Sequence, residues 1–159
     1  WEKIPLSKKM DPLNIPIKVK GFDNGIAVNI GNPHVVFFGK SIENINLNDV
    51  GPKIEKHNFF PNKTNVEFIE ILGSNSIKMK VWERGVGVTL ACGSGACAAV
   101  YAGWKKKLIE STTADLRCGG DGVDHGRDCI SMVERDVRGV RVNCRNVGPA
   151  GVVGADVVK

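Results

Sequence analysis

One apolar stretch decides the fold of this chain. Residues 91–103 have the sequence ACGSGACAAVYAG, in which small and apolar side chains occupy every side of a helix. A helix that is apolar all round is buried, and its small side chains let the surrounding backbone come close. The stretch predicts a central buried helix over residues 94–109. Because segments with strand character precede and follow it, we expect a curved sheet wrapped around this helix.

Short β-type segments alternate with turn signals in the rest of the chain. Before the central helix, the expected strands span residues 15–20, 25–30, 35–39, 65–72 and 76–83. A short helix is expected over residues 42–55, with Asn48 as its cap. After the central helix, weaker strands are expected over residues 129–133, 139–143 and 152–158. Together these elements predict an α+β domain with a mostly antiparallel, barrel-like sheet around one central helix.

The composition changes abruptly near residue 110. Residues 1–110 contain 14 Lys and one Arg, whereas residues 111–159 contain one Lys and six Arg. We therefore divide the chain into a catalytic domain over residues 1–110 and an atypical tail over residues 111–159. The tail either completes strands of the same domain or has another origin, such as a chimera or a reading-frame error. Because the first residue is Trp1 rather than Met, we expect a processed, truncated or partial chain.

Composition and charge favour a globular protein that binds neither membrane nor nucleic acid. No apolar stretch approaches the length of a membrane span, and we expect no signal peptide. The net charge is +5, but the basic run at residues 105–107 falls at the end of the predicted helix, where cations complement the helix dipole. No aromatic residues interleave with the basic ones. Five cysteines, an odd number, favour a reducing cytoplasm over a disulfide framework.

Cys92 lies where the glycine-rich turn meets the predicted helix. At a helix N-terminus, unpaired N–H groups and the positive dipole end stabilise anions. We therefore expect the Cys92 thiolate to form more easily, and the N–H groups of Gly93 and Ser94 to bind a substrate carboxylate. This arrangement suits proton transfer at an amino-acid α-carbon, because the negative charge of the transition state spreads into that carboxylate. Cys97, inside the apolar run, is expected only to pack.

Three motifs follow one another along the chain in a specific order. They are GNPH at residues 31–34, FP at residues 60–61 with TNVEF at residues 64–68, and ERGVGVTLACGSGAC at residues 83–97. With these motifs the sequence resembles the diaminopimelate epimerases, cofactor-independent enzymes of lysine biosynthesis in bacteria and plants. The resemblance covers residues 1–110 and corresponds to the C-terminal half of that family. The family's N-terminal domain, which contains the first catalytic cysteine, has no counterpart in the chain.

The resemblance implies an isomerase that inverts LL-diaminopimelate to the meso form by proton transfer between two thiols. It implies no cofactor and no metal, a small-molecule substrate, and a homodimer in the full-length enzyme. The product serves lysine and peptidoglycan precursor biosynthesis in the cytoplasm. A single base returns a proton to the same face, so inversion needs a second thiol on the opposite face. Since that thiol belongs to the N-terminal domain, this chain alone is expected to lack full activity.

The resemblance also assigns roles to individual residues. Cys92 would be one of the two catalytic thiols, Glu83 would assist it, and His34 would assist the opposite thiol. Arg84 would pair with the distal carboxylate of the substrate, for which a planar guanidinium group is well suited. The complete substrate-binding set implied in this way is Asn32, Asn65, Glu83, Arg84, Gly93 and Ser94. The sequence departs from the family at Val88, where members often have Glu, and in the tail.

Two other classes of protein share part of this pattern. A proline racemase or a phenazine-biosynthesis-type isomerase would have the same architecture. A substrate with a second charged end is favoured instead by the presence of Arg84, Asn32 and Asn65. A metal-binding or regulatory module would use cysteines and a histidine of the tail, namely Cys118, His125, Cys129 and Cys144. Zinc sites usually contain close C-x-x-C pairs, and the sequence has none.

Overall fold

The computed structural model describes residues 2–73, 76–89 and 92–109 in full, and three further strands by their backbone. The elements in chain order are β1 (Ile26–Asn29), β2 (Pro33–Gly39), α1 (Leu47–Glu55), β3 (Asn65–Gly73), β4 (Ser76–Glu83), β5 (Gly87–Thr89), α2 (Gly93–Lys105), β6 (Thr113–Cys118), β7 (Ile130–Asp136) and β8 (Gly139–Arg145). No helix among these residues is long and apolar enough to cross a membrane. The predicted α+β class is confirmed.

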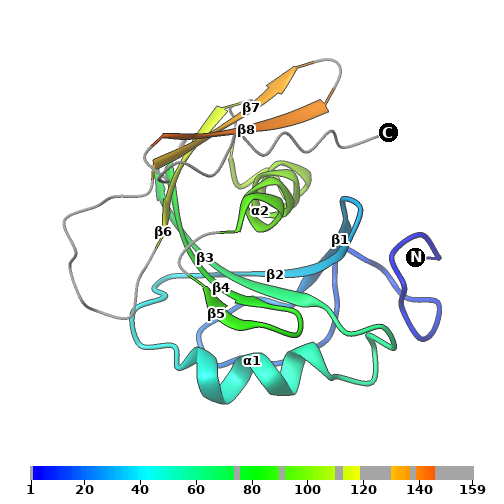
Figure 1. Ribbon diagram of the computed structural model, residues 1–159. Coiled ribbons are helices and arrows are strands. Elements are labelled where there is room, and N and C mark those ends of the chain that lie inside the picture. Colours follow the sequence, from blue (N-terminus) through cyan, green and yellow to red (C-terminus); the bar gives the residue numbers. More distant parts are fainter. Residues whose placement is uncertain are drawn as a thin grey trace.

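One mixed sheet joins the strands in the order β1-β2-β3-β4-β6-β7-β8, with β5 paired to β4. The pairs β2–β3 and β4–β6 are parallel, and the other pairs are antiparallel. Figure 1 shows the sheet curving around α2, with β1, β2 and β3 on one side of the helix and β7 and β8 on the other. The central helix is therefore confirmed. Barrel-like closure is not shown, because within the described strands no pairing joins β1 to β8.

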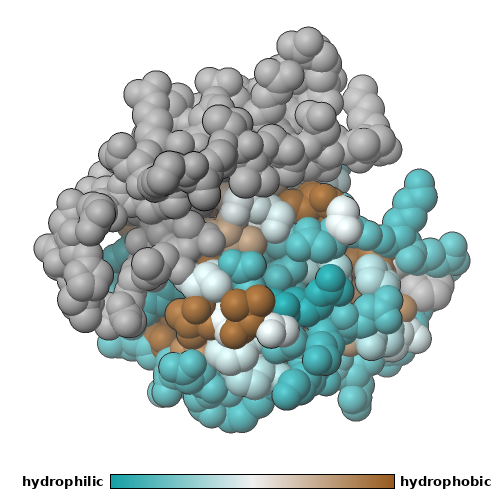
Figure 2. Space-filling view, in the orientation of Figure 1, coloured by the Kyte–Doolittle hydropathy of each residue, from teal (hydrophilic) through white to brown (hydrophobic). Residues whose placement is uncertain are grey.

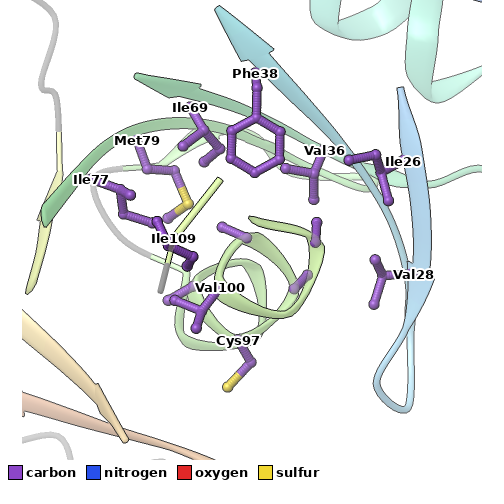
Figure 3. Packing of buried hydrophobic residues seen from close by; sticks show 14 residues of the cluster. Ile26, Val28, Val36, Phe38, Ile69, Ile77, Met79, Cys97, Val100 and Ile109 are labelled. Atoms are coloured by element: carbon purple, nitrogen blue, oxygen red, sulfur yellow. The ribbon is translucent and has the colours of Figure 1, made fainter. Parts of the chain in front are cut away.

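Both faces of the β1–β4 part of the sheet are covered, which explains the continuous apolar sequence of β2. Val36 and Phe38 of β2 pack with α2, and Figure 3 shows these side chains directed at that helix. Val35 and Phe37 alternate with them and pack on the opposite face, in a cluster that includes Ile54 of α1. A strand buried on both faces is apolar along its whole length rather than at every second residue.

The central helix α2 is buried from Gly95 to Gly103 except at the partly buried Tyr101, and it ends at Lys105, before the expected residue 109. Lys107 adopts a left-handed backbone conformation with φ 58°, and the N–H of Leu108 donates to the Gly103 carbonyl at 2.9 Å. The chain then folds back onto α2. The Ile109 side chain packs so close to Gly103 that a β-carbon on this glycine would lie only 3.1 Å from it. Small side chains thus let both the sheet and the following segment approach α2.

The start of the shorter helix was predicted wrongly. Helix α1 begins at Leu47, not at residue 42, and its cap is Asn46 rather than Asn48. The Asn46 Oδ1 atom accepts the N–H of Asn48 at 3.1 Å, which satisfies an unpaired donor of the first turn. Ile42 is fully buried, and its N–H donates to the Glu70 carboxylate of β3, so the chain before the cap is held against the sheet.

Several strand predictions also need correction. The strand expected over residues 15–20 is wrong, because only Ile15 forms a bridge, with Gly25; Pro16, which follows it, cannot donate to a ladder. The three-residue strand β5 and the strand β6 were not predicted. The expected strands over residues 129–133 and 139–143 correspond to β7 and β8, although Cys129 lies outside the described residues. Residues 152–158 also lie outside them, and the division of the chain near residue 110 stays a prediction.

Candidate functional site

The topology brings the expected site residues to one edge of the sheet. His34 and Asn65 are register partners near the starts of the parallel strands β2 and β3. Because β4 runs antiparallel to β3, its last residue, Glu83, lies at the same edge. The N-terminus of α2 reaches this edge as well, since Asn32 Nδ2 lies 3.5 Å from Ser94 Oγ. Residues separated by more than sixty positions in the sequence therefore meet in one place.

Cys92 is the N-cap of α2 and is 8% exposed. Its Sγ atom accepts the N–H of Gly95 at 3.3 Å and lies 3.3 Å from the Ser94 hydroxyl. Gly95 leaves room for both neighbours, because a β-carbon there would lie 3.0 Å from Glu67 Oε1 and 3.3 Å from the Cys92 β-carbon. The predicted placement of the thiol at a helix N-terminus is thus found in the structure.

The acidity of Cys92 differs from the expectation drawn from the helix N-terminus alone. Burial raises the pKa of the Cys92 thiol, and the negative charges of Glu67 and Glu83 raise it further. The hydrogen bonds from Ser94 and Gly95 lower the pKa but do not outweigh burial. The expectation that the thiolate forms more easily is therefore wrong for this chain as it stands.

His34 is completely buried, and both of its ring nitrogens have partners. Nδ1 lies 2.6 Å from Glu67 Oε1, and Nε2 lies 2.9 Å from Asn32 Oδ1. Asn32 thereby connects the histidine to Ser94 and to the start of α2. The structure places His34 in the site as expected, but as the middle of a hydrogen-bonded chain rather than as an open base.

Glu67 is a site residue to which the sequence analysis assigned no role. It is fully buried on β3, and its Oε2 atom has no hydrogen-bond partner among the described residues. Burial raises the pKa of Glu67; the charge and hydrogen bond of His34 oppose this shift, and the charge of Glu83 adds to it. A sequence signal did exist: a carboxylate in an apolar strand, two residues after Asn65 and therefore on the same face of the sheet.

Glu83 and Arg84 lie where β4 turns toward β5. The Glu83 carboxylate accepts a hydrogen bond of 2.6 Å from the Thr89 hydroxyl. The Arg84 backbone N–H donates to Asn65 Oδ1 at 2.8 Å, while the Asn65 amide donates to the Pro33 carbonyl at 2.9 Å. Asn65 therefore connects the first residue of β2 to the turn after β4, in addition to any contact that it makes with a ligand.

A second buried carboxylate, Glu55 of α1, holds the same turn from the opposite face of the sheet. Its two oxygens accept hydrogen bonds from Trp82 Nε1 at 2.8 Å and from the backbone N–H of Gly85 at 3.0 Å. The helix can approach because Gly51 has no side chain: a β-carbon there would lie 2.5 Å from the Trp82 ring. The sequence analysis missed this residue, since its role depends on the packing of α1 against β4.

The turn between β4 and β5 is also an exposed apolar part of the surface. Val86 is 74% exposed and Val88 is 46% exposed. Figure 2 shows apolar side chains over this hairpin, surrounded by hydrophilic ones. The segment that follows Arg84 therefore projects apolar side chains outward, beside the residues that line the site.

Nothing in the described side chains favours the metal-binding alternative. Within this part of the chain no group of three or more His, Cys, Asp or Glu residues is placed to hold a metal ion. His125 and Cys129 lie outside the described residues, as do the side chains of Cys118 and Cys144.

Comparison with known proteins agrees with the motifs. A family model described as diaminopimelate epimerase matches residues 26–122. A diaminopimelate epimerase of Wolbachia sp. subsp. Brugia malayi (strain TRS) is 52% identical over 102 residues, which cover 64% of this chain and 39% of that protein. A diaminopimelate epimerase of Pelagibacter ubique (strain HTCC1062) is 47% identical over 118 residues, which cover 71% of this chain and 43% of that protein. The chain thus spans about two fifths of the length of these relatives.

Solved structures show similarity in fold at low sequence identity. A phenazine biosynthesis protein of the PhzF family from Enterococcus faecalis superposes with a TM-score of 0.51 and 12% identity, over 70% of this chain and 37% of that protein. A putative phenazine biosynthesis PhzC/PhzF protein from Clostridium difficile (strain 630) superposes with a TM-score of 0.50 and 19% identity. The match covers 70% of this chain and 37% of that protein. At these identities the likeness concerns the fold alone, so the phenazine-type and proline-racemase alternatives gain no support over diaminopimelate epimerase.

Proposed function

This chain belongs to the diaminopimelate epimerase family, and we propose that it supplies one of two opposed thiols that interconvert LL- and meso-diaminopimelate. The observation that supports this proposal best is the environment of Cys92. Its sulfur lies at the N-terminus of a buried helix, where it accepts the N–H of Gly95 and shares a hydrogen bond with the Ser94 hydroxyl. His34, Glu67 and Glu83 lie around the same edge of the sheet. A proton-transfer site needs this combination of a thiol, carboxylates and fixed N–H groups.

The reacting carboxylate of the substrate would bind at the first turn of α2. The backbone N–H groups of Gly93 and Ser94 belong to the first residues of that helix, which are the ones without partners inside a helix. An α-proton is weakly acidic, so its removal requires stabilisation of the charge that develops on the carboxylate. Fixed N–H donors and the positive end of the α2 dipole provide it.

Cys92 would act as the acid when the reaction begins with Cys92 as a protonated thiol and the opposite group as a thiolate. A thiolate on the opposite face removes the α-proton, and the Cys92 S–H gives its proton to the carbon from this face. The configuration is inverted, Cys92 becomes a thiolate, and the opposite group becomes a thiol. The reverse reaction restores both. The raised pKa of Cys92 suits the donor role, because burial keeps the proton on sulfur until the carbon accepts it.

The distal end of the substrate would meet the β4–β5 turn. Arg84 would pair with the distal carboxylate, while Asn32 and Asn65 would hydrogen-bond the distal amino-acid group. Glu83, which accepts from Thr89, would contact the substrate at the reacting end. Two charged ends bound at a fixed separation select a long diamino diacid over a small amino acid such as proline.

The second thiol would come from an N-terminal domain that completes the site, and the full-length enzyme would be a homodimer. The reaction needs neither pyridoxal phosphate nor a metal, because the two thiols and the helix N-terminus perform every step. A cytoplasmic location suits this proposal, since both thiols must stay reduced. The product would enter the biosynthesis of lysine and of peptidoglycan precursors.

The proposal is tested by joining this chain to the N-terminal domain of a related diaminopimelate epimerase. Conversion of LL- to meso-diaminopimelate is then followed by chiral chromatography. We expect conversion by the joined protein, none by this chain alone, and none after Cys92→Ala. Full turnover by the isolated chain would contradict the two-thiol mechanism, as would conversion by the Cys92→Ala protein at the unmodified rate.

A further inference from the structure

We propose that Glu67 is a positioning residue of this site, which fixes the ring of His34 through its carboxyl group. The ring in turn sets the direction of a hydrogen-bond chain that ends at the Cys92 sulfur. The importance of this role for catalysis rests on the proposed function. The test does not, because it measures the reactivity of Cys92 and the protonation of His34 in this chain. No role was assigned to Glu67 by the sequence motifs.

The first link of the chain is short and completely buried. Glu67 Oε1 lies 2.6 Å from His34 Nδ1, and both side chains are 0% exposed. Two neighbouring strands support them, since His34 is on β2 and Glu67 is on β3. Gly95 of α2 covers the carboxyl group so closely that a β-carbon there would lie 3.0 Å from Oε1. The carboxyl group is therefore enclosed by sheet and helix and has little freedom to move.

The direction of the chain follows from the chemistry of the amide. His34 Nε2 lies 2.9 Å from Asn32 Oδ1, and an amide oxygen only accepts, so Nε2 must carry a proton. The remaining proton of the pair lies between Nδ1 and Oε1. The Asn32 NH2 group then donates to Ser94 Oγ at 3.5 Å. Since that oxygen accepts from Asn32, the Ser94 hydroxyl can direct its own proton to the Cys92 sulfur, 3.3 Å away.

Without a polar group at position 67, the hydrogen bonds from His34 through Asn32 to Ser94 would no longer keep one donor-to-acceptor order. With Nδ1 unpartnered, the two neutral forms of the His34 ring become similar in energy. In the form whose Nε2 accepts, the Asn32 amide must reverse and present its oxygen to Ser94. The Ser94 hydroxyl then donates to that oxygen instead of to sulfur, and Cys92 loses one of its two donors.

The test measures how much the Ser94 hydroxyl contributes to the reactivity of Cys92. Alkylation of Cys92 by iodoacetamide is followed at one fixed pH by mass spectrometry of its peptide, with and without Ser94→Ala. This pair is made in three backgrounds: unmodified, Glu67→Gln and Glu67→Met. Both Glu67 variants remove the charge and keep an unbranched chain, so they differ only in the polar group that reaches Nδ1.

We expect Ser94→Ala to slow alkylation about threefold or more in the unmodified chain and in Glu67→Gln. In Glu67→Met the slowing should fall below about 1.5-fold, because the hydroxyl no longer donates to sulfur in most molecules. Nitrogen NMR of the His34 ring should show one protonation form in Glu67→Gln and a mixture in Glu67→Met. Glu67→Leu provides the same comparison if the Met variant does not fold.

An equal effect of Ser94→Ala in all three backgrounds would overturn the inference, as would an unchanged His34 spectrum in Glu67→Met. These measurements need no substrate. If they succeed while the joined protein fails to epimerise diaminopimelate, the proposed function is wrong and the positioning role of Glu67 stands. If they fail while epimerisation succeeds, only the positioning role is wrong.

Discussion

Replacement of the buried Glu55 carboxylate by an amide should weaken the attachment of α1 to the turn that contains Arg84. Glu55 accepts two hydrogen bonds, from Trp82 Nε1 at 2.8 Å and from the Gly85 N–H at 3.0 Å. In Glu55→Gln one oxygen remains, and the NH2 group faces a donor. A buried donor left without a partner costs about 1–3 kcal/mol, and the other bond loses its charge assistance, about 1 kcal/mol. We expect a loss of about 2–4 kcal/mol in the free energy of unfolding.

Urea unfolding followed by circular dichroism measures this loss. With a slope of roughly 2 kcal/mol per molar urea, the midpoint should fall by about 1–2 M. Glu43→Gln is the matched control, because Glu43 pairs with Lys78 while 58% of its side chain is exposed. Exposed pairs contribute little, so that variant should lose less than about 1 kcal/mol. Trp82→Phe removes one donor and completes a double-mutant cycle, in which a coupling of about 1 kcal/mol or more is expected.

The reasoning about Glu55 would be refuted if Glu55→Gln were no more destabilising than Glu43→Gln. A coupling near zero with Trp82→Phe would refute the specific hydrogen bond. In either case the turn would be held by the Asn65 contact with the Arg84 N–H, which neither substitution touches.

Three further changes test other parts of the structure. Phe68→Ala should cost about 3–5 kcal/mol in urea unfolding, because Phe68 is fully buried and stacked on Phe37 at 5.3 Å; a loss below about 1.5 kcal/mol would contradict this packing. Gly95→Ala should destabilise by about 1–3 kcal/mol despite the better helix propensity of Ala, and a gain in stability would show that the Glu67 carboxyl can move away. Ser94→Ala removes a donor that lowers the pKa of Cys92, so the pH profile of Cys92 alkylation should shift to higher pH; a shift to lower pH would be inconsistent with that hydrogen bond.

Local sequence patterns were sufficient to predict the centre of the fold. The small side chains of residues 94–103 specify a helix that can only be buried, and the structure surrounds it with strands. The strand expected over residues 15–20 failed because a β-type composition does not supply pairing partners. The short strand β5 was missed because three residues are too few for a pattern.

The candidate site was predicted unevenly, for a physical reason. The placement of Cys92 depends on the helix that follows it, and a local argument captures this. The pKa of its thiol is raised mainly by burial and further by the charges of Glu67 and Glu83, which belong to other strands, so the same local argument gave the wrong direction. Glu67 and Glu55 acquire their roles only through the side chains that face them after folding. The sequence shows such carboxylates as unusual in their segments but does not show their partners.

The most direct test of the central claim is deuterium exchange at the α-carbon of diaminopimelate. The joined protein is incubated with substrate in deuterated water, and incorporation is measured by mass spectrometry for Cys92→Ala and Cys97→Ala. Cys97 lies five residues further along the same helix and is fully buried in the core. We predict that Cys97→Ala retains exchange with inversion, whereas Cys92→Ala loses deuterium delivery from its face and inverts nothing. Inversion by Cys92→Ala at the rate of the Cys97→Ala protein would contradict the account.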